Sequence, residues 1–134
     1  SSAKWIAKRL NITEFQASSA IETLGRLGLI KIYGGRLIRT SKPICSTHNV
    51  PSQALRNYHR QNLLLAEQCL TLEPICRRIF GSISMTLDPK KMHLADKLIS
   101  EFKERFSDLM ISNHSTEVYT LAIQFFPLTK GVQE

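Results

Sequence analysis

The sequence has few cysteines, few acidic residues and few aromatic residues, and it contains no long hydrophobic run. Its three cysteines (Cys45, Cys69, Cys76) are odd in number and form no C-x-x-C pair, which excludes a disulfide framework. No apolar run approaches the roughly 18–20 residues that span a bilayer, so no membrane association is expected. Residues 1–4 do not start a secretory signal either. These absences predict a cytoplasmic protein.

Residues that carry catalysis or bind metal ions are also sparse. The sequence has no G-x-S-x-G, no phosphate-binding glycine loop and no H-E-x-x-H, and its four histidines are scattered. Cys45 and His48 lie three residues apart and offer two metal ligands, but no second pair is nearby. We therefore expect no catalytic residue, no metal, no cofactor and no enzymatic activity.

What the chain does carry is an unevenly placed positive charge. Its 134 residues include 18 Lys+Arg and 11 Asp+Glu, a formal net charge of +7. Residues 1–40 hold seven basic and two acidic residues, a net +5, whereas residues 73–134 hold eight of each. A basic segment of this kind is typical of proteins that bind an anionic partner, most often DNA. A basic surface that only faces solvent would have the same charge.

The first forty residues have the element order of a winged helix-turn-helix. Helical spacing covers residues 3–10 and 13–27, with Thr13 placed as N-cap of the second helix and Gly28 as its C-terminal stop. Two β-prone runs follow around Gly34-Gly35, a dipeptide suited to a two-residue hairpin turn. The second helix has an apolar stripe of Ala17, Ala20, Ile21, Leu24 and Leu27. The order resembles a winged helix over residues 1–40, with the hairpin as the wing.

A recognition helix reads base edges with its solvent face, and basic groups around it hold phosphates. The residues predicted to bind DNA are Gln16, Ser19, Thr23 and Arg26 on the helix and Lys31, Arg36 and Arg39 on the hairpin. Glu14 and Glu22 on the same helix suit phosphate contact poorly. They leave open an alternative in which the winged helix docks a protein partner.

Residues 41–52 are predicted to be a linker, and residues 53–134 a second domain. A helix over 53–72, capped by Ser52, is followed by an alternating strand over 77–87. Asp88-Pro89 then opens a helix of about twenty residues, and a last strand covers 118–126. Strand–helix–strand favours a parallel pair, which is marginal with only two strands. We expect a partner strand or a homodimer to complete the sheet.

Several segments of the second half resemble an uncharacterised bacterial family of conserved hypothetical proteins with a domain of unknown function. The resemblance rests on Tyr58-His59-Arg60, Leu64-Leu65-Ala66, Ser82–Leu87, Val118-Tyr119 and above all the ending Gln124-Phe125-Phe126-Pro127-Leu128-Thr129. It implies that this chain is the C-terminal half of a cytoplasmic, regulator-like protein, and it brings no established activity. Members often have an Arg-acidic pair before the Ser-rich strand, where this chain has Arg77-Arg78.

The sequence therefore predicts an α+β chain with an N-terminal winged helix, a connecting helix and a C-terminal strand–helix–strand domain. The leading hypothesis is a DNA-binding transcriptional regulator whose second domain dimerises or senses a signal. The alternative is a non-enzymatic protein-interaction module. A ligand pocket between the helix over 53–72 and the sheet is neither supported nor excluded.

Overall fold

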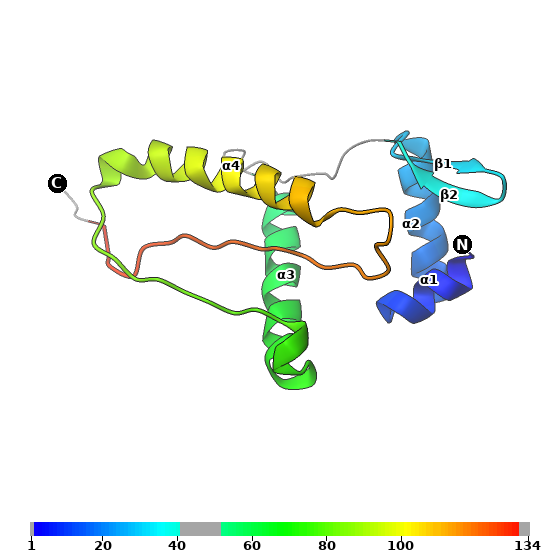
Figure 1. Cartoon of the computed structure of the whole chain (residues 1–134), viewed down its shortest axis with the longest axis horizontal. Coiled ribbons are helices and arrows are strands. Elements are labelled where there is room, and N and C mark those ends of the chain that lie inside the picture. Colours follow the sequence, from blue (N-terminus) through cyan, green and yellow to red (C-terminus); the bar gives the residue numbers. More distant parts are fainter. Residues whose placement is uncertain (1, 41–51, 132–134) are drawn as a thin grey trace. The chain divides into compact units, whose positions relative to one another are not determined.

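The computed structural model describes residues 2–40 and 52–131, and the chain divides into two compact units near residue 47 (Figure 1). The described residues form four α-helices and one two-stranded antiparallel sheet, which confirms the α+β class. The predicted linker over 41–52 lies outside the described residues, apart from Ser52. None of the described helices is both long enough and apolar enough to cross a membrane.

The first unit begins with two helices that contact each other, α1 (Ala3–Leu10) and α2 (Glu14–Arg26). Their bounds agree with the predicted helices to within one residue at each end. Ala7 of α1 and Ala17 of α2 are the two buried residues of the part of the chain that the structure describes. Two side chains of one methyl group each let helices approach closely, so this small core depends on close backbone packing. Three residues of the predicted apolar stripe, Ala20, Leu24 and Leu27, are instead exposed.

The end of α2 is tied to the hairpin by backbone hydrogen bonds. Gly28 takes a φ of +72°, which a residue with a Cβ adopts at a cost, and the Leu29 N–H donates to the Leu24 carbonyl at 2.9 Å. The chain then forms β1 (Ile30–Tyr33) and β2 (Arg36–Arg39), joined by two glycines of positive φ. At the far end of the hairpin, the Thr40 N–H donates to the Leu29 carbonyl at 2.9 Å. The predicted hairpin is confirmed.

The second unit contains the two longest helices. α3 (Gln53–Leu72) has the predicted bounds, and Ser52 Oγ accepts the Leu55 N–H at its start. A short 3-10 turn, η1 (Ile75–Arg77), follows it. Asp88 caps a second turn, η2 (Pro89–Lys91), and α4 (Met92–Met110) continues from there. The helix predicted to open at Asp88-Pro89, the fourth in the chain, is therefore present, with its first turn tightened to 3-10 geometry.

Arginine side chains hold the end of α3. Arg78 Nε donates to the Glu73 carbonyl at 3.1 Å, and its Nη2 donates to the Leu70 carbonyl at 3.4 Å. These bonds satisfy two of the carbonyls that a helix end leaves without an intrahelical partner. Arg77 Nε bonds Glu73 Oε2 at 2.9 Å, and this hydrogen bond with the carboxylate charge raises the pKa of Arg77.

The two predicted strands of the second unit are not formed as a sheet. Residues 78–88 and 117–127 lie outside regular secondary structure in the described chain, and Figure 1 shows both as drawn-out stretches that run in the same direction. Alternation of apolar and polar residues specifies an extended backbone, but a strand also needs a neighbour about 4.8 Å away. The predicted parallel pairing is wrong. A side-chain bond instead joins the second stretch to η1, just before the first stretch, since Tyr119 Oη donates to the Arg77 carbonyl at 2.9 Å.

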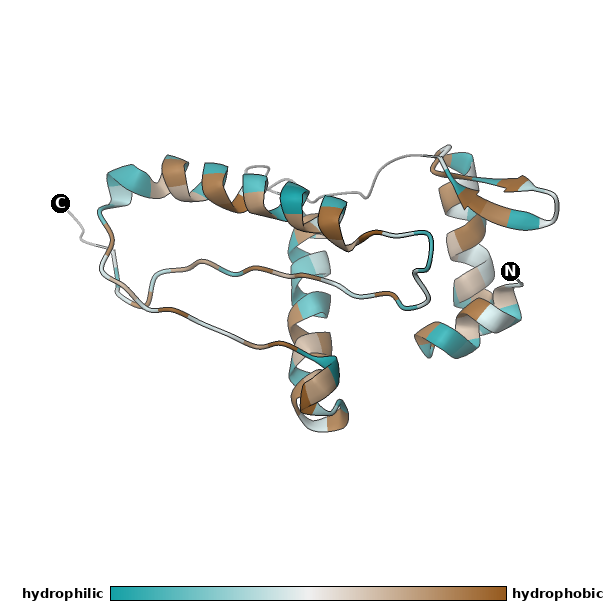
Figure 2. Ribbon diagram, in the orientation of Figure 1, coloured by the Kyte–Doolittle hydropathy of each residue, from teal (hydrophilic) through white to brown (hydrophobic). Residues whose placement is uncertain are grey.

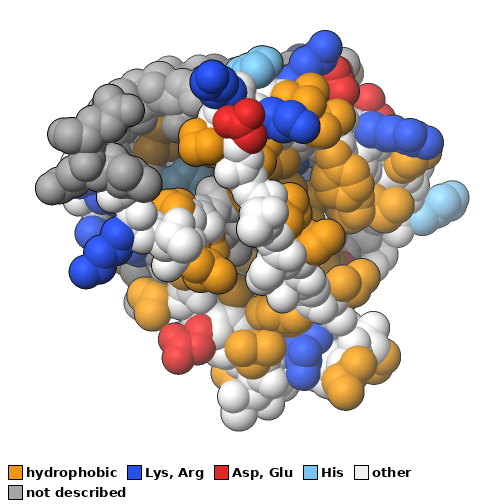
Figure 3. Space-filling view, turned by 90° about the vertical axis from the view of Figure 1, so that its left-hand side faces the viewer, with side chains coloured by type: hydrophobic (Ala, Val, Ile, Leu, Met, Phe, Trp, Pro, Cys, Tyr) orange, Lys and Arg blue, Asp and Glu red, His pale blue; other side chains and the backbone are white. Residues whose placement is uncertain are grey.

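The second unit has no buried residue within 52–131. Along α4 and both extended stretches, hydrophobic residues recur with helical or alternating spacing (Figure 2), yet Ile79 is 99% exposed and Ile83 is 80% exposed. Figure 3 shows hydrophobic side chains open to solvent across the face that it presents. Burial of one Leu, Ile or Phe side chain stabilises a fold by about 1.5–3 kcal/mol, and this unit gains little of that by itself.

Candidate nucleic-acid interface

The start of α2 is closed by a reciprocal pair of hydrogen bonds between Thr13 and Gln16. Thr13 Oγ1 accepts the Gln16 N–H at 3.1 Å, and Gln16 Oε1 accepts the Thr13 N–H at 2.9 Å. The Thr13 hydroxyl also donates to Gln16 Oε1 at 3.2 Å. This capping box confirms Thr13 as the N-cap and fixes the direction in which Gln16 leaves the helix.

The capping box changes what Gln16 can recognise. A glutamine that reads adenine accepts a hydrogen bond with its amide oxygen and donates one with its amide nitrogen. Here the oxygen is already bonded to Thr13, so the Nε2 group is what Gln16 has to offer. A pair of donors without an acceptor suits guanine O6 and N7, or thymine O4, better than adenine.

Four predicted DNA-binding residues share one side of α2. Gln16, Ser19, Thr23 and Arg26 follow one another at spacings of three, four and three residues, which places them in one row along a helix. All four are exposed. We call these four residues the α2 row. Arg26 stands in the last turn, where a cation is favoured by the helix dipole.

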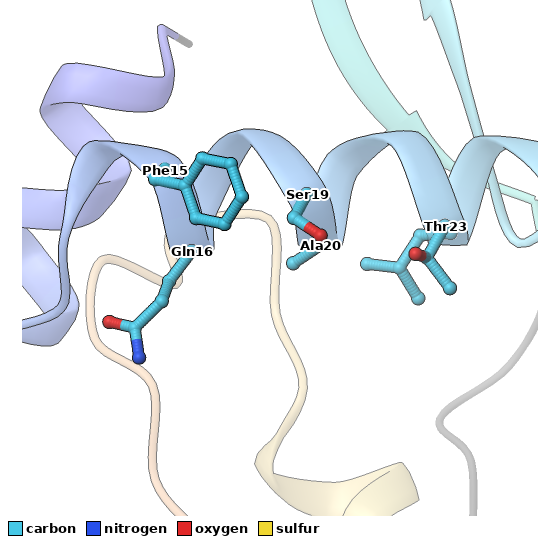
Figure 4. A pocket seen from close by; sticks show the side chains of 6 residues that line it. Phe15, Gln16, Ser19, Ala20 and Thr23 are labelled. Carbon is cyan, nitrogen blue, oxygen red and sulfur yellow. The ribbon is translucent and has the colours of Figure 1, made fainter.

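An open groove of about 440 Å³ follows part of this row (Figure 4). The side chains that line it all come from α2, and they are Phe15, Gln16, Ser19, Ala20, Thr23 and Leu24. Three residues of the α2 row therefore lie beside apolar side chains. Phe15 and Ala20 were not predicted as site residues.

Phe15 is the clearest addition to the predicted site. Its side chain is 81% exposed although it stands next to the capping box. The sequence does contain a signal for it, because the helical offset of Phe15 from Ala17, which is buried, and from Ile21, which is half-buried, places this aromatic residue outside their stripe. Apolar side chains in a DNA groove contact the methyl group of thymine, and exposed aromatic residues are also typical of protein interfaces.

The hairpin separates its three predicted cations onto two faces. Tyr33 pairs with Arg36, and Lys31 pairs with Ile38, so Lys31 and Arg36 lie on the same face of the hairpin. Arg39 pairs with Ile30 and lies on the other face. That face contains the two half-buried residues of the hairpin, Ile30 and Leu37. The open face therefore presents Lys31 and Arg36 as diagonal neighbours, with Tyr33 and Ile38 on the same face beside them.

The described residues form no cluster suited to metal chemistry. Within the described ranges, no group of three or more His, Cys, Asp or Glu side chains is placed to hold a metal ion. Cys45 and His48, the pair considered from the sequence, lie outside those ranges.

Comparison with known proteins gives one match. The family model described as a domain of unknown function, DUF4423, matches residues 1–128. The chain belongs to the DUF4423 family. No curated protein and no solved structure matches the chain.

The extent of the match matters for the site. DUF4423 covers the capping box, the α2 row and the hairpin, and it continues through α3, α4 and both extended stretches. The family domain is therefore built from both units. The predicted resemblance to an uncharacterised family is confirmed, and residues 124–128 of its Gln124–Thr129 ending fall inside the matched range.

Proposed function

We propose that this chain is a transcriptional regulator of the cytoplasm that binds DNA through its first unit, with the hairpin as the wing of a winged helix-turn-helix. The α2 row reads base edges, and the open face of the hairpin holds phosphate. The second unit dimerises or senses a signal, and neither unit is an enzyme.

One observation carries the proposal. The α2 row and the hairpin cations belong to a single unit whose described residues, 2–40, have seven basic and two acidic side chains. Hydrogen-bonding groups in a row along a helix, flanked by cations, are what reading and positioning on a duplex need. The second unit has ten basic and eight acidic residues over 52–131, a net +2, so most of the excess positive charge lies in the first unit, at +5 over 2–40.

The test is a titration of the purified chain into a labelled random-sequence DNA duplex at several salt concentrations. Each phosphate contact adds about 0.9 to the slope of log K against log salt. We expect a negative slope equivalent to two or three contacts, about −2 to −3, for a site supplied by Lys31, Arg36 and Arg26. No binding at low salt overturns the proposal. The double variant Lys90→Ala/Lys91→Ala removes two charges from η2 of the second unit and is the matched control, with an unchanged slope.

A second candidate function is supported by Phe15. An exposed aromatic residue beside Ala20 and Leu24, on a helix that also has Glu14 and Glu22, suits a protein partner as well as it suits a duplex. In this alternative the first unit is a docking module. Phe15→Ala distinguishes the two: it relaxes sequence preference but leaves salt-dependent DNA binding if the chain is a regulator. If the chain docks a protein, DNA binding is absent for both the parent and the variant.

A further inference from the structure

The second unit has apolar faces that none of its own described elements covers. Its apolar residues follow the spacing of a buried helix face in α4 and of buried strand faces in 79–87 and 118–126, yet none of them is buried. A helix or a sheet that is hydrophobic on one face is stable when that face packs against another element. Within residues 52–131 no element takes that role, since α3 and α4 do not contact each other.

The extended stretches are also unprotected. Residues 79–87 and residues 118–126 are nine residues long each, and neither contains a charged residue or a proline. Exposed strand edges in soluble proteins are normally blocked by charges, prolines or bulges, because free N–H and C=O groups pair with any strand that arrives. The absence of such residues indicates that these edges are covered in the working molecule.

Residues 78–88 match an antiparallel copy of themselves. When the two copies are centred on Ile83, Arg78 of one lies opposite Asp88 of the other, and Ile79 lies opposite Leu87. Odd-numbered residues stay opposite odd-numbered residues in this register. Those residues are Ile79, Gly81, Ile83, Met85 and Leu87. The apolar face therefore continues across the pair, while Ser82 meets Ser84 on the other face.

We propose that a second copy of this chain pairs with residues 79–87 in that antiparallel register, and that the joined apolar faces form the shared core of a symmetric dimer. A twofold axis through Ile83 makes the contact self-complementary, as closed dimers require. Charge agrees with this choice, since opposite charges meet at both ends and the unit as a whole is only +2 over 52–131.

The charged residues at the two ends of the stretch, Arg78 and Asp88, each keep a hydrogen-bonding group available for this pairing. Arg78 is held at the end of α3 by its bonds to Leu70 and Glu73, which use Nε and Nη2 and leave Nη1 as a further donor. Asp88 Oδ1 accepts the Lys90 N–H at 3.1 Å, which leaves Oδ2 as an acceptor. Both charges are thus fixed at the two ends of the nine-residue stretch. The inference stands on the second unit alone, whether or not the first unit binds DNA.

Cysteine cross-linking tests the register directly. In a chain whose three native cysteines (Cys45, Cys69, Cys76) are replaced by serine, Ile83→Cys places two thiols at the twofold axis, within disulfide range. Ile79→Cys is the matched control, because eight residues of extended chain separate the two copies of that position by about 26 Å. We expect Ile83→Cys to form a covalent dimer at least about tenfold faster than Ile79→Cys under mild oxidation. The double variant Ile79→Cys/Leu87→Cys should restore cross-linking.

Sedimentation of the unmodified chain, without nucleic acid, supplies a readout that depends on no substitution. The expected mass is twice the 15.2 kDa of one chain. A monomer at micromolar concentration overturns the proposal. In that case a segment of a longer parent chain, instead of a second copy, would cover the apolar faces. Equal cross-linking of Ile83→Cys and Ile79→Cys overturns the register. Loss of DNA binding with the dimer intact affects the proposed function and leaves this inference unchanged.

Discussion

Gln16 Oε1 accepts the backbone N–H of Thr13 at 2.9 Å, so a residue predicted to read DNA also closes the start of its own helix. Substitution of Gln16 is therefore expected to change two properties at once, the stability of α2 and the proposed recognition of a base. The two can be separated because the cap uses the oxygen of the side chain, whereas the proposed recognition of a base uses the Nε2 group.

We expect Gln16→Glu to keep the stability of the first unit and to alter sequence preference, because a carboxylate still accepts the Thr13 N–H but donates nothing. Gln16→Ala should alter preference and also lower the free energy of unfolding by roughly 0.5–1 kcal/mol. Site selection from a random duplex pool and urea unfolding measure the two effects. Ser18→Glu adds the same charge outside the α2 row and is the control. Unaltered preference in both Gln16 variants would remove Gln16 from the readout.

The faces of the hairpin give the second prediction. Lys31→Ala/Arg36→Ala removes both cations of the open face and should flatten the salt slope of DNA binding by about one to two units. Arg39→Ala removes a cation from the face shared with Ile30 and Leu37, and should flatten it by less than about half a unit. Titration at four salt concentrations measures both slopes. A larger effect from Arg39 would mean that the hairpin approaches DNA with its other face.

The third prediction concerns the core of the first unit. Ala17 is fully buried, so Ala17→Leu forces extra volume between α1 and α2 and should lower the free energy of unfolding by about 1–3 kcal/mol. Ala20→Leu makes the same change of side chain on the exposed groove and should change it by less than about 0.5 kcal/mol. Urea unfolding followed by the fluorescence of Trp5 compares them. Equal losses would show that Ala17 has room around it.

The fourth prediction concerns the end of α3. Arg78→Ala removes two hydrogen bonds to helix carbonyls and should lower the stability of α3 by about 1 kcal/mol. Arg77→Ala removes an exposed ion pair with Glu73 and should have a smaller effect, which added salt diminishes further. Helix content by circular dichroism during thermal unfolding follows both variants. We expect the Arg78 variant to lose more stability than the Arg77 variant, and the reverse order would contradict the prediction.

Local signals predicted most of the secondary structure. Thr13 and Ser52 cap the helices they were expected to cap, Gly28 ends α2, and Gly34-Gly35 forms the hairpin turn. Each of these depends on residues within a few positions of one another, so the sequence around them is sufficient.

Pairing of residues 77–87 with 118–126 could not be predicted in the same way. An alternating pattern fixes which side chains share a face, but it does not say which strand lies beside it, and that neighbour can belong to another chain. Phe15 and Ala20 were not predicted as site residues for a related reason. A thirteen-residue helix with apolar residues on two sides leaves open which side is buried until α1 is placed against it.

The bonds that join Thr40 to the end of α2 govern how the first unit opens. The Thr40 N–H donates to the Leu29 carbonyl, and the Thr40 hydroxyl donates to the Gly28 carbonyl. The Leu29 N–H in turn donates to the Leu24 carbonyl in α2. Unwinding the last turn of α2 therefore releases the hairpin, and fraying of the hairpin loosens that turn. In hydrogen exchange, the amides of Leu29 and Thr40 should exchange together as one cooperative segment. A duplex that holds only the hairpin would then slow exchange in α2 as well.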